Sequence, residues 1–156
     1  MIVNRLTPYA EEIIEDYQCG FRRNRSTSDQ MFTIRQLLEK KWEHVEALHQ
    51  LLIGFKKAYD SIVRARMYWI LVFLGIPKKL VRLIEACLRG SKGKVRANGN
   101  LSEEFSIHDG LKQGDALSCI LFNLVLEYVV RQVQTEPTGA TPNEICLLYT
   151  SDAADE

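Results

Sequence analysis

The chain has 156 residues, 46% of them hydrophobic and 26% charged, which is typical of one globular domain and excludes a disordered or fibrous protein. The longest apolar run, residues 67–75, is far shorter than the roughly 18 residues of a membrane span, and no secretory signal is present, so we expect an intracellular protein, nuclear or cytoplasmic, without a membrane partner. The net charge is zero, but residues 17–99 hold 17 basic and 6 acidic side chains, and this +11 stretch calls for an anionic partner such as a nucleic-acid backbone.

The first half of the chain contains the signals of two helices and one strand. Thr7 followed by Pro8 predicts the start of a short helix over residues 9–14. After an irregular stretch, Thr27 or Ser28 can cap a long amphipathic helix with one buried stripe. The apolar positions of that stripe are Met31, Ile34, Leu38, Trp42, Val45 and Leu48. Residues 51–55 are apolar on both faces, which predicts a central strand.

The second half of the chain alternates helices with one hairpin. Helices are predicted over residues 64–74 and 77–88, each followed by a glycine that ends it. Asn98 and Gly99 mark the turn of a hairpin whose arms lie on either side. A further helix begins at Asp115, and the proline- and glycine-containing residues 136–142 predict a boundary.

Three short patterns carry the chemistry of this chain. The first, Gln-Cys-Gly-Phe-Arg-Arg-Asn-Arg-Ser-Thr over residues 18–27, places three arginines in a turn-rich stretch where they can contact phosphates. The second, Leu-Ile-Gly-Phe-Lys-Lys-Ala-Tyr-Asp over residues 52–60, is a strand that runs into a tight turn. The third, Gly-Leu-Lys-Gln-Gly-Asp-Ala-Leu-Ser over residues 110–118, is a glycine-bracketed loop that opens a helix and presents hydrogen-bond donors. A hairpin exit before a capped helix would also explain the third pattern, apart from Gln113.

In this order and at this spacing the three patterns resemble the reverse transcriptases of non-LTR retrotransposons, and the resemblance covers nearly all of residues 4–139. It implies a right-hand polymerase, of which this chain supplies the rear of the fingers and most of the palm. The expected fold class is α+β, with a small antiparallel sheet packed on several helices. The implied organisation is a mainly helical remainder of the fingers over residues 1–49, a palm over residues 50–136, and a linker with a non-native tail over residues 137–156.

The resemblance also implies roles for individual side chains. The expected nucleotide-binding residues are Phe55, Tyr59, Gln113 and Gly114, and the expected template-binding residues are Arg22, Arg25 and Lys112. Tyr59 falls where the aromatic gate of the family meets the sugar of the incoming nucleotide. Considered without the resemblance, Tyr59 is equally well interpreted as a core aromatic beside Ala58. Asp60 lies past a turn, and we expect it to cap the following helix.

The metal-ligand pattern of the family is broken in this chain. The family places one aspartate on the strand of the second pattern and two consecutive aspartates on a later hairpin, where they hold two magnesium ions. Gly54 stands at the position of the first aspartate, and Asp152 and Asp155 are not consecutive. We therefore expect no retained catalytic residue and no well-bound magnesium. The four cysteines and three histidines are too scattered for a zinc site or a disulfide framework, and we expect reduced, mostly buried thiols.

These observations predict an inactive fragment of a retroelement reverse transcriptase. In the intact family, such a domain extends a DNA primer on an RNA template, using deoxynucleoside triphosphates and magnesium. One alternative is a non-catalytic nucleic-acid-binding remnant that uses the same basic surface. The other alternative is a pseudogene product without function.

Overall fold

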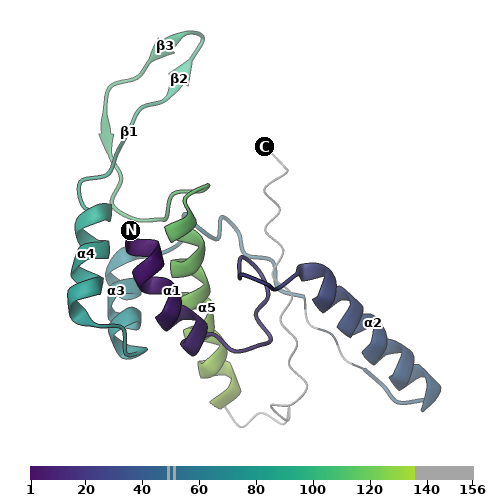
Figure 1. The fold of residues 1–156 in the computed structure, drawn as a ribbon. Coiled ribbons are helices and arrows are strands. Elements are labelled where there is room, and N and C mark those ends of the chain that lie inside the picture. The colour runs from purple at the N-terminus through teal and green to yellow at the C-terminus, as the bar shows by residue number, and fades with distance from the viewer. Residues whose placement is uncertain (49, 51, 136–156) are drawn as a thin grey trace.

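The computed structural model of the chain describes residues 1–48, 50 and 52–135. In chain order its elements are α1 (Ile2–Ile13), α2 (Thr27–Glu43), α3 (Arg64–Phe73), α4 (Lys78–Leu88), β1 (Lys92–Gly93), β2 (Arg96–Ala97), β3 (Asn100–Leu101), β4 (Phe105–Ser106) and α5 (Ala116–Thr135). Helices combined with short antiparallel strand pairs confirm the expected α+β class (Figure 1). The expected boundary at residues 136–142 and the expected non-native tail lie outside the described residues.

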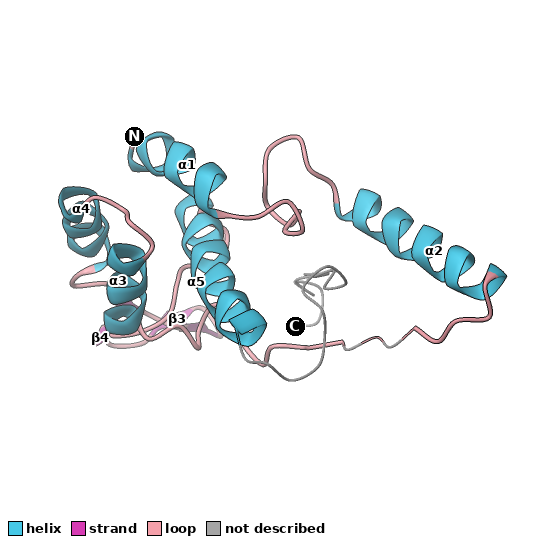
Figure 2. Cartoon of the chain, turned by 90° about the horizontal axis from the view of Figure 1, so that it is seen from below, coloured by secondary structure: helices cyan, strands magenta, loops and turns pink. Residues whose placement is uncertain are grey.

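The core of this part is built by α1, α3, α4 and α5, which lie together in both views (Figures 1 and 2). α5 contacts both α1 and α3, and its Leu121 and Leu124 are fully buried. Leu6 of α1, Leu71 of α3 and Ile84 of α4 are fully buried in the same cluster. Because each such side chain contributes about 1.5–3 kcal/mol when it leaves water, these four helices hold most of the stabilising contacts.

α5 is long and apolar enough over Ala116–Val133 to match a membrane span by length and composition. Half of that stretch is buried inside the structure, where its leucines belong to the core. The central helix of a packed domain is apolar for the same reason, so packing accounts for the composition of α5. No unbroken apolar run marks this stretch in the sequence, because Asn123, Glu127 and Arg131 interrupt it.

Local signals placed α3 and α4 correctly. At the end of α3, Gly75 adopts a φ of +88°, which glycine reaches without the strain that a Cβ would cause. The amide of Ile76 donates to the carbonyl of Leu71 at 3.0 Å, and the amide of Gly75 donates to that of Val72 at 3.1 Å. These two bonds form a Schellman motif, which Ile76 completes by its burial beside Leu71.

α1 begins earlier than expected, at Ile2 rather than near residue 9. Pro8 lies inside the helix, where it cannot donate a backbone hydrogen bond. The Thr7 hydroxyl donates to the carbonyl of Val3 at 2.8 Å and therefore does not cap a helix start. The helix continues through the proline because Leu6 and Ala10 are buried in the core on one face.

α2 stands apart from the four core helices in both views, and its predicted stripe is not buried (Figures 1 and 2). Met31, Leu38, Trp42 and Val45 are exposed, with Trp42 86% exposed. Val45 lies beyond the helix, which ends at Glu43. The expectation of one buried stripe was wrong because an apolar stripe becomes buried only where another element covers it, and no element in the described part of the chain covers this face.

Replacing Trp42 with alanine is expected to change the free energy of unfolding by no more than about 0.5 kcal/mol, because the side chain has little buried area to lose. The control is Leu124→Ala in the core, which is expected to cost about 2–5 kcal/mol. Urea denaturation followed by circular dichroism measures both. A cost for Trp42→Ala as large as that of Leu124→Ala would show that α2 packs on the core in solution.

The predicted central strand is not formed over the described residues of that stretch. Residues 52–55 are an exposed loop, so the expected strand of the second pattern was wrong. A strand requires a hydrogen-bonded neighbour, and none of the strand pairs in the described residues involves this run.

The hairpin has the expected turn, but its strands do not pack against the helices. Asn98 and Gly99 have φ values of 50° and 81°, as a two-residue type I′ turn requires, and β2 pairs with β3 across it. β1 and β4 pair at the base. The hairpin projects from the helices (Figure 1), so the expectation of a sheet packed on them was wrong. Its arms are largely polar or charged, as Lys92, Lys94 and Glu104 illustrate, and they offer no continuous apolar face.

Candidate nucleic-acid site

The first pattern contacts the side chain of Asn123 in α5, the helix that the third pattern opens. The Gln18 amide nitrogen donates to Asn123 Oδ1 at 3.1 Å, and Asn123 Nδ2 donates to the carbonyl of Gly20 at 2.8 Å. Both amide side chains are almost completely buried, so these bonds are sheltered from water. The start of the arginine-containing loop is therefore held against the helix that follows the glycine loop.

The second pattern meets the same helix through its aromatic side chains. The ring of Tyr59 stacks on that of Phe122 with a centroid distance of 5.1 Å, and Phe55 meets Phe122 edge-on at 6.2 Å. The Tyr59 hydroxyl lies 3.6 Å from Cys119 Sγ. Tyr59 is half-buried, whereas Phe55 is exposed and Phe122 is buried. Tyr59 thus packs on the core with one side of its ring and still reaches the surface.

The glycine loop lies directly against the second pattern. The amide of Gly110 donates to the carbonyl of Ile62 at 2.8 Å, and that of Leu111 donates to the carbonyl of Tyr59 at 3.0 Å. A Cβ at Gly110 would come within 3.1 Å of the Asp60 backbone, and the φ of this residue is +80°, so both the close approach and the backbone conformation favour glycine here.

The part of the loop that follows Leu111 faces solvent. Lys112, Gln113 and Gly114 are exposed, and Gly114 has a φ of +89°. Asp115 Oδ1 accepts from the amide of Leu117 at 3.2 Å and caps α5, which agrees with the predicted start of this helix at Asp115. Lys112, Gln113 and Gly114, which the resemblance assigns to ligand binding, are therefore accessible to a partner molecule, while Gly110 and Leu111 are hydrogen-bonded to the second pattern.

Two of the three arginines of the first pattern pair with acidic side chains of the preceding segment, and of the three only the Arg22 side chain is buried. The Arg22 side chain is only 5% exposed, pairs with Glu11 at 2.8 Å and donates to the carbonyls of Glu15 and Gln18 at 2.7 and 3.1 Å. Arg25 pairs with Asp16. Arg22 therefore holds its own loop in place, and the Arg25 side chain is the more exposed of the two.

The buried carboxylate of Glu127 joins α1 and its following loop to α5. The Tyr17 hydroxyl donates to Glu127 Oε2 at 2.9 Å, and Arg131 Nε donates to Glu127 Oε1 at 2.7 Å. Burial, reinforced by the hydrogen bond and the negative charge of Glu127, raises the pKa of the Tyr17 hydroxyl well above its usual value. Arg131 also donates to the carbonyl of Ile13. Asn123 and Glu127 are four residues apart, so both polar contacts lie on one face of α5.

The sequence analysis did not identify Asn123, Glu127 or Arg64, whose polar contacts hold these segments together. Asn123 and Glu127 carry a signal that could have found them, because two polar side chains one turn apart interrupt an otherwise apolar helix. Arg64 carries no such signal, because it sits in a basic cluster that is typical of exposed helix ends. It is nevertheless 6% exposed, with its guanidinium bonded to backbone carbonyls.

Asp60 does not cap α3 as expected. The amide of Arg64 at the start of α3 donates instead to Asp109 Oδ1 at 3.1 Å, and Val63 at the capping position provides no side-chain bond. The expectation was wrong because the oxygen comes from a segment 45 residues away, which the local sequence cannot reveal. The expectation of mostly buried thiols was also wrong for the described cysteines, because only Cys19 among Cys19, Cys87 and Cys119 is buried.

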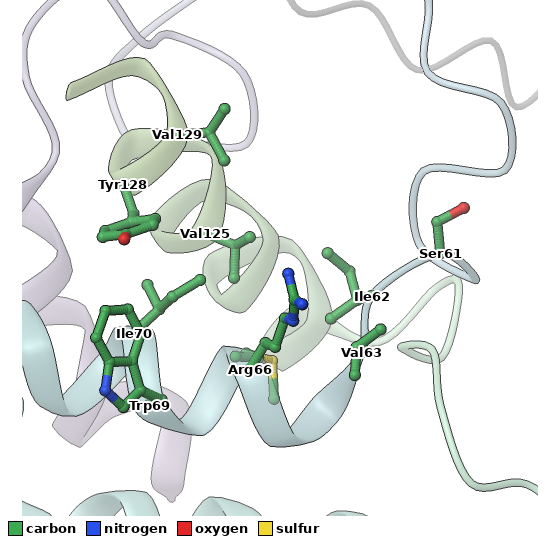
Figure 3. A pocket seen from close by; sticks show the side chains of 10 residues that line it. Ser61, Ile62, Val63, Arg66, Trp69, Ile70, Val125, Tyr128 and Val129 are labelled. Atoms are coloured by element: carbon green, nitrogen blue, oxygen red, sulfur yellow. The ribbon is translucent and has the colours of Figure 1, made fainter. Parts of the chain in front are cut away.

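An apolar pocket of about 570 Å³ lies between α3 and α5, beside the end of the second pattern (Figure 3). The residues that line it are Ser61, Ile62, Val63, Arg66, Met67, Trp69, Ile70, Val125, Tyr128 and Val129. The Arg66 guanidinium lies among apolar side chains of both helices (Figure 3). Trp69, Phe73 and Tyr128 continue this face as a ring cluster with centroid distances of 5.3 to 5.7 Å.

The described residues do not provide a magnesium site. Gly54 has no side-chain oxygen, and no group of three histidine, cysteine, aspartate or glutamate side chains in the described part of the chain could hold a metal ion. Magnesium requires several oxygen ligands in octahedral array. The donor set of residues 1–48, 50 and 52–135 therefore does not fit this ion.

Comparisons with known proteins agree on one family. The family described as reverse transcriptase (RNA-dependent DNA polymerase) matches residues 1–154. The chain is 31% identical over 128 residues to the Pol polyprotein of the type-2 retrotransposable element R2DM of Drosophila melanogaster. The aligned region covers 82% of this chain and 12% of that protein. The chain is 26% identical over 104 residues to the Pol polyprotein of the type-1 retrotransposable element R2 of Popillia japonica, covering 67% of this chain and 17% of that protein.

A third relative comes from a different element. The chain is 23% identical over 155 residues to the probable RNA-directed DNA polymerase of transposon X-element of Drosophila melanogaster, covering 94% of this chain and 17% of that protein. The chain thus spans 12 to 17% of the length of these three relatives. No solved structure matches it.

Proposed function

This chain belongs to the reverse transcriptase family of non-LTR retrotransposons, and we propose that it is a catalytically inactive member that retains a nucleic-acid-binding site. The observation that carries this proposal is the meeting of all three patterns on α5, through Asn123, Phe122 and the glycine loop. An RNA template paired with a DNA primer is the proposed ligand, since the family copies RNA into DNA.

The proposed architecture is a part of a right-hand polymerase. Residues 1–49 would be the remainder of the fingers, residues 50–136 the palm, and residues 137–156 a linker and a non-native tail. α1 packs in the same core as the palm helices, so this division would separate roles and not independently folded units. The projecting α2 would then be the part of the fingers that stands beyond that core.

The proposed contacts follow the surface around the glycine loop. Gln113 and Gly114, with Phe55 and Tyr59, would meet the nucleotide, because the loop and Tyr59 are joined by a direct backbone bond. Lys112 and Arg25 would meet the template strand. Arg22 would support that strand indirectly, because its guanidinium is already bonded to Glu11 and to two carbonyls of its own loop.

The proposed inactivity rests on Gly54. The metal ions of the family are held by carboxylates, and nucleotidyl transfer requires both ions to be held together. Glycine at this position removes one of those carboxylates. Binding through phosphate contacts does not depend on that carboxylate, so the chain can lose catalysis and keep its ligand.

A binding measurement with a matched pair of lysine variants tests the proposed site. Fluorescence anisotropy of a labelled RNA/DNA primer–template is expected to show binding by the unmodified chain. Lys112→Ala is expected to weaken binding to all sequences and to lower the slope of log affinity against log salt by about one. Lys78→Ala removes the same charge from the exposed start of α4 and is expected to leave the affinity unchanged. Equal effects of the two variants would contradict a site at the glycine loop.

A further inference from the structure

We propose that Arg64 is a positioning residue that holds the glycine loop, residues 109–114, at a fixed place beside Tyr59. The inference rests on the proposed function for the identity of the ligand, but the loop and the arginine are described by the structure itself. Arg64 is buried and acts through the loop, so it is not expected to touch the ligand.

The Arg64 guanidinium joins α3 to two segments that are distant in sequence, residues 88–91 and 107–110. Its Nε donates to the carbonyl of Gly110 at 2.8 Å, and its Nη1 donates to the carbonyl of Leu88, at the end of α4, at 2.7 Å. The same Nη1 lies 3.4 Å from the carbonyl of Ile107 and 3.5 Å from Ser91 Oγ, both beside the hairpin. All four acceptors are neutral, so the guanidinium serves as a branched donor to backbone and hydroxyl groups.

The peptide groups on either side of Gly110 are hydrogen-bonded both to the backbone of residues 59–62 and to the side chain of Arg64. The amide of Gly110 donates to the carbonyl of Ile62, and its carbonyl accepts from Arg64. The amide of Leu111 donates to the carbonyl of Tyr59, and Asp109 Oδ1 accepts from the amide of Arg64. These four bonds tie the base of the loop to the segment that carries Tyr59. The exposed residues 112–114 follow directly from that base.

A lysine cannot reproduce this arrangement. The carbonyls of Gly110 and Leu88 are both within 2.8 Å of the guanidinium, but they are reached by two different nitrogens of a planar fork. A lysine ammonium presents its donors from a single atom and would leave the carbonyl of Gly110 or that of Leu88 without its bond to residue 64, although Ser91 Oγ would still donate to the carbonyl of Leu88. The loop would then lose the hydrogen bond from residue 64 that helps to fix residues 112–114 relative to Tyr59.

Hydrogen exchange of the free protein tests the positioning without any ligand. Arg64→Lys and Arg64→Met are expected to raise exchange by about tenfold or more at the amides of Gly110 and Leu111, which donate to the carbonyls of Ile62 and Tyr59. Each lost bond to a charged donor changes an equilibrium by about that factor. Exchange in α1 and in the middle of α5 is expected to stay unchanged. Arg66→Met, which removes the same charge from an exposed site on the same helix, is the control and is expected to leave the loop unchanged.

Binding of the RNA/DNA primer–template provides the second readout. Arg64→Lys is expected to weaken the affinity about tenfold at an unchanged salt slope, because the loop is displaced while the number of phosphate contacts stays the same. If Arg64→Met does not fold, Gly110→Ala gives the same test from the other side, since its Cβ would press on the Asp60 backbone at 3.1 Å.

The outcomes separate this inference from the proposed function. Unchanged exchange at the amides of Gly110 and Leu111, or an equal rise throughout the core, would overturn the positioning role. A local rise in exchange with unchanged affinity would also overturn it and would leave the binding function standing. A smaller salt slope in Arg64→Lys would show that Arg64 contacts phosphate directly and would overturn it too. If the unmodified chain binds no primer–template, the proposed function fails, and the exchange measurement alone decides the role of Arg64 in the loop.

Discussion

Primer extension on an RNA template is expected to be absent from the unmodified chain and to remain absent when Gly54→Asp is introduced alone. The reason is the number of metal ligands, because in-line transfer needs two magnesium ions held together by several carboxylates. One restored aspartate offers a single ligand. Magnesium gives up its water reluctantly, so one carboxylate would leave it largely hydrated.

Recovery is expected only in a rebuilt chain. It would carry Gly54→Asp and a hairpin with two consecutive aspartates in place of residues 144–156. The measurement is primer extension with the unmodified chain, the single variant and the rebuilt chain, each with and without magnesium. Magnesium-dependent extension by either of the first two, if it survives repurification away from contaminating polymerases, would show that Gly54 does not occupy the metal-binding position.

The affinity for an RNA/DNA duplex is expected to fall about 10³-fold between about 50 and about 200 mM salt, if roughly six phosphates are contacted. Each neutralised phosphate releases a bound counterion, and added salt opposes that release. Lys56, Lys57, Arg66 and Lys112 are exposed near the second and third patterns and can supply such contacts. Arg22 is not expected to contribute, because its guanidinium is already paired.

Anisotropy titrations across this salt range, with duplexes of unrelated sequence, measure the effect. Affinity should depend little on sequence, because phosphate contacts position a protein without reading bases. An affinity that does not change with salt, or a strong preference for one sequence, would contradict a phosphate-dominated interface.

The local sequence by itself determined where several elements begin and end. Gly75 ends α3 and Asn98-Gly99 turns the hairpin because those positions require positive φ, which is a property of the residue and not of its surroundings. Asp115 caps α5 for a similar reason, since its oxygen reaches an amide two residues on. The family could also be recognised from three short patterns, because their residues and spacing are legible without coordinates.

Only the tertiary structure decided which predicted surfaces are covered. Residues 52–55 have the composition of a strand but lack a hydrogen-bonded neighbour in the described residues, and the stripe of α2 lacks a covering element there. Both expectations depended on a partner segment that composition does not specify. The same holds for charge, because Arg22 was expected to contact the template and its side chain is instead buried against residues 11–18, while Arg64 is buried by contacts with segments 24 to 46 residues away.

The site itself depends on both levels. The sequence identified the glycine loop and Tyr59 as functional candidates, but it could not show that a backbone hydrogen bond joins them. Nor could it show that Asn123 and Phe122 of α5 contact the first and second patterns. Turns and caps are set by the conformational preferences of a few adjacent residues. Burial, pairing and the neighbours of a charged side chain are set by packing between segments as far as 118 residues apart, and only the folded chain determines them.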